Sequence, residues 1–121
     1  MTRFGMTFQP GDLVIVPFPF SDLDATKKRP VLVLTAPDRR GDFIGLAVTS
    51  VPTERCALEV EVNALRKGAL PKQSWIRLDK IFTLNAHRVE GICAQVTPAF
   101  RVRTVQALCV NLMPEPTIHF S

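Results

Sequence analysis

Leu13-Val-Ile-Val-Pro-Phe18 is a continuous apolar run that begins directly after Gly11 and Asp12. A short apolar run bounded by turn residues is typical of a buried β-strand. Pro17 has no backbone N–H to give to a neighbouring strand, so we expect the strand to end or to reach a sheet edge there. The run therefore predicts one strand of a sheet with an apolar interior.

Five further runs have strand character, and prolines, glycines and charged turns separate them. They are Val31–Thr35, Phe43–Ser50, Leu58–Val62, Trp75–Asp79 and Val89–Val96. The segment 63–74 shows no such pattern and is expected to be a loop. The segment 80–88 is ambiguous and fits a helical turn and a chain reversal.

The segment after Thr97 has helical character. Thr97 is a suitable N-cap, and Pro98 suits the first turn of a helix. Apolar residues then recur at helical spacing, at Val102, Val105, Leu108, Cys109 and Leu112, which predicts an amphipathic helix that ends before Pro114. Five or six short strands followed by one helix predict a small curled sheet or partly closed barrel with the helix packed on it.

The chain has 121 residues and a formal net charge of +4. This length fits a single domain over residues 1–121, with flexible ends expected at 1–10 and 114–121. Small clusters of lysine and arginine favour a polyanionic partner, although a basic protein without one fits the charge equally well. No run approaches the roughly 20 apolar residues of a membrane span, and the N-terminus lacks a signal-peptide pattern. These features predict a cytoplasmic protein without membrane contact.

The cysteines and histidines show no metal-site pattern. Cys56, Cys93 and Cys109 are an odd number without a CxxC motif, and we expect them to be buried, reduced thiols. His87 and His119 do not lie at ligand spacing from any cysteine. The sequence therefore predicts neither a metal site nor a cofactor.

The run Trp75–Asp79 carries residues with chemical potential. Strand periodicity places Trp75, Arg77 and Asp79 on one face and Ile76 and Leu78 on the core face. Tryptophan can stack on a base, arginine can hold a phosphate, and aspartate can accept a proton. The alternative is a surface ion pair beside a partly buried tryptophan, an arrangement that contributes little to stability.

Two other strand ends offer polar groups. The run Phe43–Ser50 is expected to place Ile44, Leu46 and Val48 in the core and the mostly small residues Phe43, Gly45, Ala47 and Thr49 on the other face. Thr49 and Ser50 provide hydroxyls, although both types are common at strand ends. Arg29 lies between Lys28 and Pro30, which favours an extended backbone. Arginine suits a phosphate clamp, but an isolated arginine is more often a solvated charge.

Four stretches resemble the MazF/PemK toxins in their order and spacing: Gly11–Phe18, Lys28-Arg29-Pro30-Val-Leu-Val-Leu, Ala47-Val-Thr49-Ser50 and Trp75-Ile-Arg77-Leu-Asp79. The resemblance extends from about Gly11 to near Met113. It implies a mainly β fold of the MazF/CcdB type, with a small, strongly bent antiparallel sheet or partly closed barrel, short helices and a C-terminal helix. It also implies a homodimer.

The resemblance further implies sequence-specific, metal-independent cleavage of single-stranded RNA by the toxin of a toxin–antitoxin pair. The family's active-site arginine falls on Arg29 and its threonine on Thr49, with Ser50 next to Thr49. An arginine and an aspartate that act in some members fall on Arg77 and Asp79. We therefore hypothesise that Asp79 is the general base, that the two arginines stabilise charge, and that the hydroxyls orient the phosphate.

The first loop differs from that of some members, in which a histidine contributes. This sequence has no histidine there, and its polar residues are Ser21, Asp22 and Asp24. We expect residues 20–28, with Phe20, Ser21 and Lys28, to act as a flap that contacts RNA, and Trp75 to stack on a base. Phe18 fits core packing better, and Phe20 fits base stacking and core packing about equally. The resemblance also implies a cognate antitoxin, whose disordered acidic segment would suit the basic clusters.

Three other functions remain open at this point. A CcdB-like gyrase poison shares the fold, and a supercoiling assay would distinguish it. A catalytically silent nucleic-acid or peptide binder would bind RNA without releasing products. A purely structural domain would use its apolar surplus only for oligomerisation.

Overall fold

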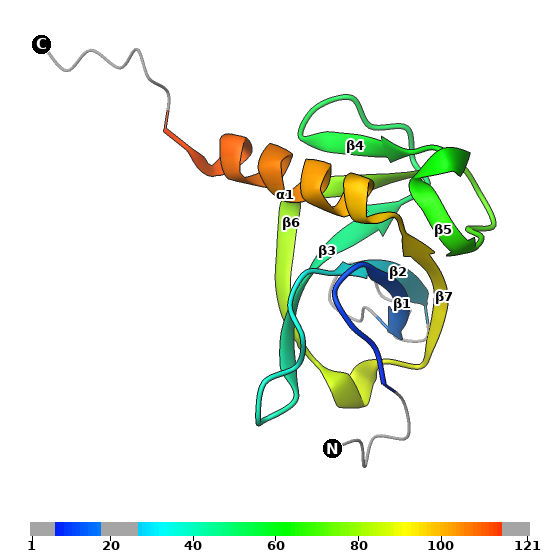
Figure 1. Ribbon diagram of the computed structural model, residues 1–121, viewed down its shortest axis with the longest axis vertical. Helices are drawn as coiled ribbons and strands as arrows, with labels where there is room; N and C mark the ends of the chain where they lie inside the picture. The colour runs from blue at the N-terminus through cyan, green and yellow to red at the C-terminus, as the bar shows by residue number, and fades with distance from the viewer. Residues whose placement is uncertain (1–6, 18–26, 115–121) are drawn as a thin grey trace, which may run out of the picture.

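The computed structural model describes residues 7–17 and 27–114. Within them, one seven-stranded antiparallel sheet curls into a half barrel, and a single α-helix crosses one side of it (Figure 1). The strand order along the sheet is β4-β6-β3-β2-β1-β7-β5. The predicted fold class, including the C-terminal helix, is confirmed.

The strands are β1 (Asp12–Pro17), β2 (Lys28–Val33), β3 (Asp42–Thr49), β4 (Ala57–Val60), β5 (Leu65–Gly68), β6 (Ser74–Asn85) and β7 (Gly91–Val96). The 3-10 helices η1 (Val62–Ala64) and η2 (Ala86–Arg88) follow β4 and β6, and α1 spans Pro98–Leu112. Because η1 joins β4 directly to β5, the two ends of the sheet are adjacent along the chain. This short connection brings the open edges of the half barrel toward each other.

Three parts of the chain differ from the prediction. The expected loop 63–74 contains β5, whose Arg66-Lys67-Gly68 sequence lacks apolar alternation because it forms a charged edge strand. The ambiguous segment 80–88 continues β6 as far as Asn85 and then reverses through η2. Val62, expected to continue the fourth strand, lies in η1 and is 91% exposed.

The central strands are buried on both faces. Leu13, Leu32 and Leu46 contribute to the core beneath α1, whereas Val14 and Val31 contribute to a second core on the opposite face. A strand buried on both faces needs apolar residues at every position. The continuous apolar run of β1 has this cause.

The second core corrects the expected sides of β3. Phe43 is only 1% exposed and packs edge-on against Phe8, with 4.9 Å between the ring centroids. Ile44, expected in the core, is 39% exposed. The curl of the sheet and the N-terminal residue Phe8 therefore bury one end of the face that the sequence suggested was open.

Helix α1 begins and ends as predicted. The Thr97 Oγ1 atom accepts a hydrogen bond of 3.1 Å from the Phe100 N–H, which caps the first turn. The predicted apolar stripe is largely wrong, because the buried residues are Phe100, Thr104 and Leu108. Val102, Val105 and Leu112 are exposed.

Among the cysteines, Cys109 is exposed, and Cys56 and Cys93 are only partly buried. All three thiols are free. No helix within the described ranges is long and apolar enough to cross a membrane.

Replacing Gly68 with alanine should lower the free energy of unfolding by about 3 kcal/mol. Gly68 has φ +73°, and a Cβ there would lie 2.2 Å from the Cys93 carbonyl oxygen and 2.7 Å from the Ala94 Cα. Both contacts are with backbone atoms, so β5 would have to separate from β7. Urea unfolding of the two proteins measures the difference.

Gly91→Ala is the matched control, because a Cβ at Gly91 meets no atom within 4 Å. We expect that variant to stay within about 1 kcal/mol of the parent protein. Equal losses in the two variants would show that the close approach of β5 to β7 is not the cause.

Candidate active site

A row of residues crosses the sheet near one end of β6. Trp75 lies directly opposite Thr49 of β3 on one side and directly opposite Glu59 of β4 on the other. Residues directly opposite each other in an antiparallel ladder project their side chains from the same face. Because neighbouring strands are about 4.8 Å apart, the backbones of Thr49 and Glu59 are separated by about 10 Å.

Arg29 extends this row onto β2. Val31 pairs with Ala47, and two more residues in that register bring Arg29 level with Thr49. The ladder between β2 and β3 begins at Val31, immediately after Pro30, which has no N–H to donate. Arg29 is half-buried, and its Nε atom is enclosed by the protein. The guanidinium is therefore held at the point where the two strands stop pairing.

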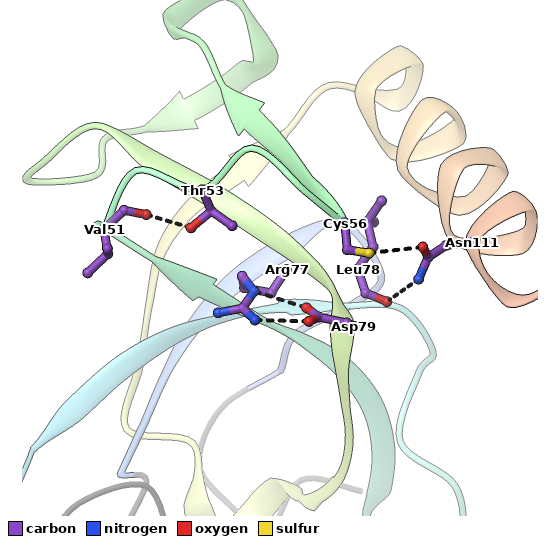
Figure 2. A network of polar contacts seen from close by, with 7 residues as sticks. All are labelled: Val51, Thr53, Cys56, Arg77, Leu78, Asp79 and Asn111. Atoms are coloured by element: carbon purple, nitrogen blue, oxygen red, sulfur yellow. Dashed lines mark hydrogen bonds and ion pairs between the residues drawn. The ribbon is translucent and has the colours of Figure 1, made fainter.

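Arg77 and Asp79 form the next part of the same face. Arg77 Nε and Nη2 each donate a hydrogen bond of 2.9 Å to Asp79, to Oδ1 and Oδ2 respectively (Figure 2). Ile76 and Leu78, which alternate with them, are buried in the core beneath α1. The predicted division of this strand into a core face and a polar face is confirmed.

The ion pair shifts both groups toward their charged forms. The hydrogen bond from Arg77 lowers the pKa of Asp79, against a smaller opposing effect of burial. The same hydrogen bond raises the pKa of Arg77. Asp79 is therefore ionised at neutral pH and able to accept a proton, but it is a weak base while Arg77 holds it.

The surface between these groups is lined with small residues. Gly45 and Ala47 precede Thr49 on this face of β3, and a Cβ on Gly45 would lie 2.4 Å from Val31 Cγ1. The close packing of Gly45 against Val31 keeps that end filled by the second core. Phe43 and Gly45 are buried, whereas Ala47 and Thr49 are only partly buried, so the accessible part of this face lies at the Ala47–Thr49 end.

Hydroxyl groups gather where β3 leaves the sheet. Thr49 Oγ1 accepts a 3.1 Å hydrogen bond from the Val51 N–H. Thr53 Oγ1 donates a 2.7 Å hydrogen bond to the Val51 carbonyl oxygen, as Figure 2 shows. A hydroxyl that accepts one hydrogen bond still has its own O–H to donate. Ser50 is exposed at the start of this loop. Thr49 and Ser50 can therefore both donate to an anionic oxygen.

Helix α1 holds β6 from the opposite face. Asn111 Nδ2 donates to the Leu78 carbonyl oxygen at 3.5 Å, while the Cys56 thiol donates to Asn111 Oδ1 at 3.2 Å (Figure 2). Leu78 lies between Arg77 and Asp79 in β6, so these contacts hold the backbone that carries the ion pair.

Some predicted site residues lie elsewhere. Lys28 forms a 2.7 Å ion pair with Glu90, and both side chains are about half exposed. Phe18, Phe20 and Ser21 lie outside the described residues, as does most of the expected flap. Within the described ranges, no group of three or more histidine, cysteine, aspartate or glutamate side chains is arranged to hold a metal ion.

Two polar residues beside the site were missed by the sequence reasoning. Glu59 shares the face of Trp75, and its Oε2 atom accepts a hydrogen bond from Gln73 Nε2. The alternation of Glu59 with Leu58 and Val60 did indicate a polar strand face. Only the pairing of β4 with β6 brings that face beside Trp75.

The side chain of Asp79 should titrate below the ordinary aspartate pKa of about 3.9, and Arg77→Gln should move the titration upward. A carboxyl whose pKa is lowered in the folded state stabilises the folded protein at pH values above the pKa that the group has in the unfolded state. This stabilisation is lost as the pH falls through the folded-state pKa. Because the side chain is 39% exposed, solvent screening keeps the contribution small. A carboxyl-carbon NMR titration measures both values, and an unchanged midpoint in Arg77→Gln would contradict the assigned cause.

Comparison with known proteins identifies the family. The family profile described as PemK-like, MazF-like toxin of type II toxin–antitoxin system matches residues 9–112. No curated protein matches the sequence. The fold resembles that of solved MazF structures at low sequence identity.

The MazE–MazF complex of Deinococcus radiodurans (Form II) aligns with a TM-score of 0.68 and 18% identity, covering 91% of this chain and 99% of that chain. A mycobacterial endoribonuclease in complex with its cognate antitoxin aligns with a TM-score of 0.62 and 18% identity, covering 91% of this chain and 98% of that chain. The Mycobacterium tuberculosis toxin MazF-mt6 aligns with a TM-score of 0.61 and 19% identity, covering 80% of this chain and 91% of that chain. Because the family profile matches most of the length of this chain, the chain belongs to the PemK-like, MazF-like toxins of type II toxin–antitoxin systems.

Proposed function

We propose that the protein is an endoribonuclease that cuts single-stranded RNA at short sequences without a metal ion. The observation that carries this proposal is the common face of β2, β3 and β6. It gathers two guanidinium groups, a hydroxyl and a carboxylate from Arg29, Arg77, Thr49 and Asp79. These are the groups needed around a phosphodiester that reacts with its own 2′-hydroxyl.

In this reaction the 2′-oxygen attacks phosphorus and the bond from phosphorus to the 5′-oxygen breaks. The products are a 2′,3′-cyclic phosphate and a 5′-hydroxyl. The bound phosphate separates Asp79 from Arg77, and Asp79 then takes the proton from the 2′-hydroxyl. Because the pKa of Asp79 is lowered, proton removal contributes modestly, and stabilisation of the phosphorane charge contributes more.

The two arginines have different roles in this mechanism. The raised pKa of Arg77 makes it a poor proton donor, so it acts as a fixed positive charge toward a non-bridging oxygen. Arg29 is assigned to the leaving 5′-oxygen, which must gain a proton. Thr49 and Ser50 donate hydrogen bonds that orient the phosphate.

Partners follow from the same proposal. The solved relatives from Deinococcus radiodurans and a mycobacterial species are complexes with antitoxins, and we propose a cognate antitoxin for this chain. An acidic, disordered segment would suit a protein with net charge +4. We also propose a homodimer and a cytoplasmic location, with residues 1–121 as one domain.

Purified protein incubated with mixed RNA and an excess of chelator tests the proposal. We expect fragments whose 5′ ends carry hydroxyl groups and map to one short sequence. Intact RNA after prolonged incubation, or cleavage that requires an added metal ion, would overturn it.

A further inference from the structure

We propose that Glu59 and Gln73 recognise a guanine base that stacks on Trp75, next to the phosphodiester that is cut. The inference rests on the proposed function, because it names one base of the same RNA substrate. Glu59 and Thr49 lie directly opposite Trp75 on its two sides. A base on the indole would therefore have the phosphate-binding hydroxyl on one side and the Glu59 carboxylate on the other.

Glu59 and Gln73 form a connected polar edge. Gln73 Nε2 donates to Glu59 Oε2, which brings an amide N–H beside a carboxylate. Glu59 is partly buried, whereas Gln73 is exposed in the loop before β6. Together they present adjacent acceptors on the carboxylate and an adjacent donor on the amide.

Guanine matches this order of groups. Its Watson–Crick edge presents two neighbouring donors, N1–H and the 2-amino group, followed by the O6 acceptor. Adenine and cytosine each place an acceptor nitrogen beside their amino group, and uracil places its single N–H between two carbonyls. A carboxylate can therefore accept two hydrogen bonds only from guanine, with Gln73 left to donate to O6.

A groove with both basic and acidic side chains continues from this edge. It lies between the two open ends of the sheet and has a volume of about 710 Å³, and its charged residues are Glu59, Glu61, Arg66, Lys67 and Lys72. Lysine and arginine side chains bind backbone phosphates without distinguishing bases. The groove therefore offers a path for the strand beyond the recognised guanine.

Trp75 provides a direct signal, because it is the only tryptophan in the chain. We would titrate the protein with 2′-O-methyl-uridine heptamers that carry guanine, inosine or adenine at the centre and cannot be cut. Binding should quench Trp75 fluorescence, and guanine should bind about tenfold more tightly than inosine, which lacks only the 2-amino group. Equal binding of guanine and inosine would overturn the inference.

Glu59→Gln should exchange the preference from guanine to adenine, because a glutamine amide matches the donor and acceptor of an adenine edge. Gln73→Met should weaken guanine binding but leave the discrimination against inosine. Glu61→Gln is the charge-matched control, since it removes a carboxylate from the same groove and should change affinity equally for all three heptamers. A Glu59→Gln variant that keeps the wild-type order of bases would also overturn the inference.

Cleavage mapping separates this inference from the proposed function. If the protein cuts RNA but shows no guanine preference that depends on Glu59, the base assignment fails and the nuclease proposal stands. If the protein leaves RNA intact but binds the guanine heptamer through Glu59, the nuclease proposal fails and the guanine site stands.

Discussion

Replacing Arg29 with alanine should reduce the rate of RNA cleavage by about 10²–10³-fold, the usual effect of losing one preorganised donor aimed at developing charge. Arg29 lies level with Thr49 where β2 and β3 stop pairing, and its guanidinium is partly enclosed before substrate arrives. Water cannot replace a donor held in place in this way. The measurement is kcat/KM on an oligoribonucleotide that contains the mapped cleavage sequence.

Two further variants make this result specific. Arg29→Lys keeps the charge but loses the planar donor geometry, so its rate should lie between those of the parent protein and the alanine variant. Arg39→Ala removes an exposed arginine from the turn between β2 and β3 and should leave kcat/KM within about twofold. Full activity in a folded Arg29→Ala protein, as judged by circular dichroism, would remove Arg29 from the mechanism.

Arg77→Gln and Asp79→Asn should each reduce the rate of cleavage by about 100-fold. The double variant should lose about as much activity as either single variant. The reason is the pair of 2.9 Å hydrogen bonds that makes the two side chains one unit. Losing either partner removes the fixed orientation of the other as well as its own role. Residues that act as a unit show strong non-additivity in a double-mutant cycle.

Glu54→Gln is a suitable control for the cycle, because Glu54 is an exposed carboxylate in the loop between β3 and β4. It should change kcat/KM little. Additive losses, with the double variant near 10⁴-fold below the parent protein, would show that Arg77 and Asp79 act independently. In that case the mutual orientation seen in the structure would have no catalytic role.

Several parts of this structure follow from local sequence patterns. The apolar run of β1, the capped helix after Thr97 and the alternation from Trp75 to Asp79 each depend on neighbours within a few residues. Backbone geometry and side-chain periodicity act over that distance, so these features were predictable. The resemblance to MazF/PemK toxins added the candidate residues on three separate strands.

Other features depend on which strands pair. β5 has a charged sequence and becomes a strand only because it reaches β7. Helix α1 carries apolar residues on two sides, and only its packing on the sheet decides that Phe100, Thr104 and Leu108 are buried.

The sequence by itself therefore determined the main elements, the helix cap and the polar face of Trp75, Arg77 and Asp79. Only the tertiary structure brought Glu59 beside Trp75 and left the Ala47–Thr49 end as the partly exposed part of this face of β3. The physical reason is that register across a sheet arises from contacts between residues distant in the chain, and local periodicity carries no information about those contacts.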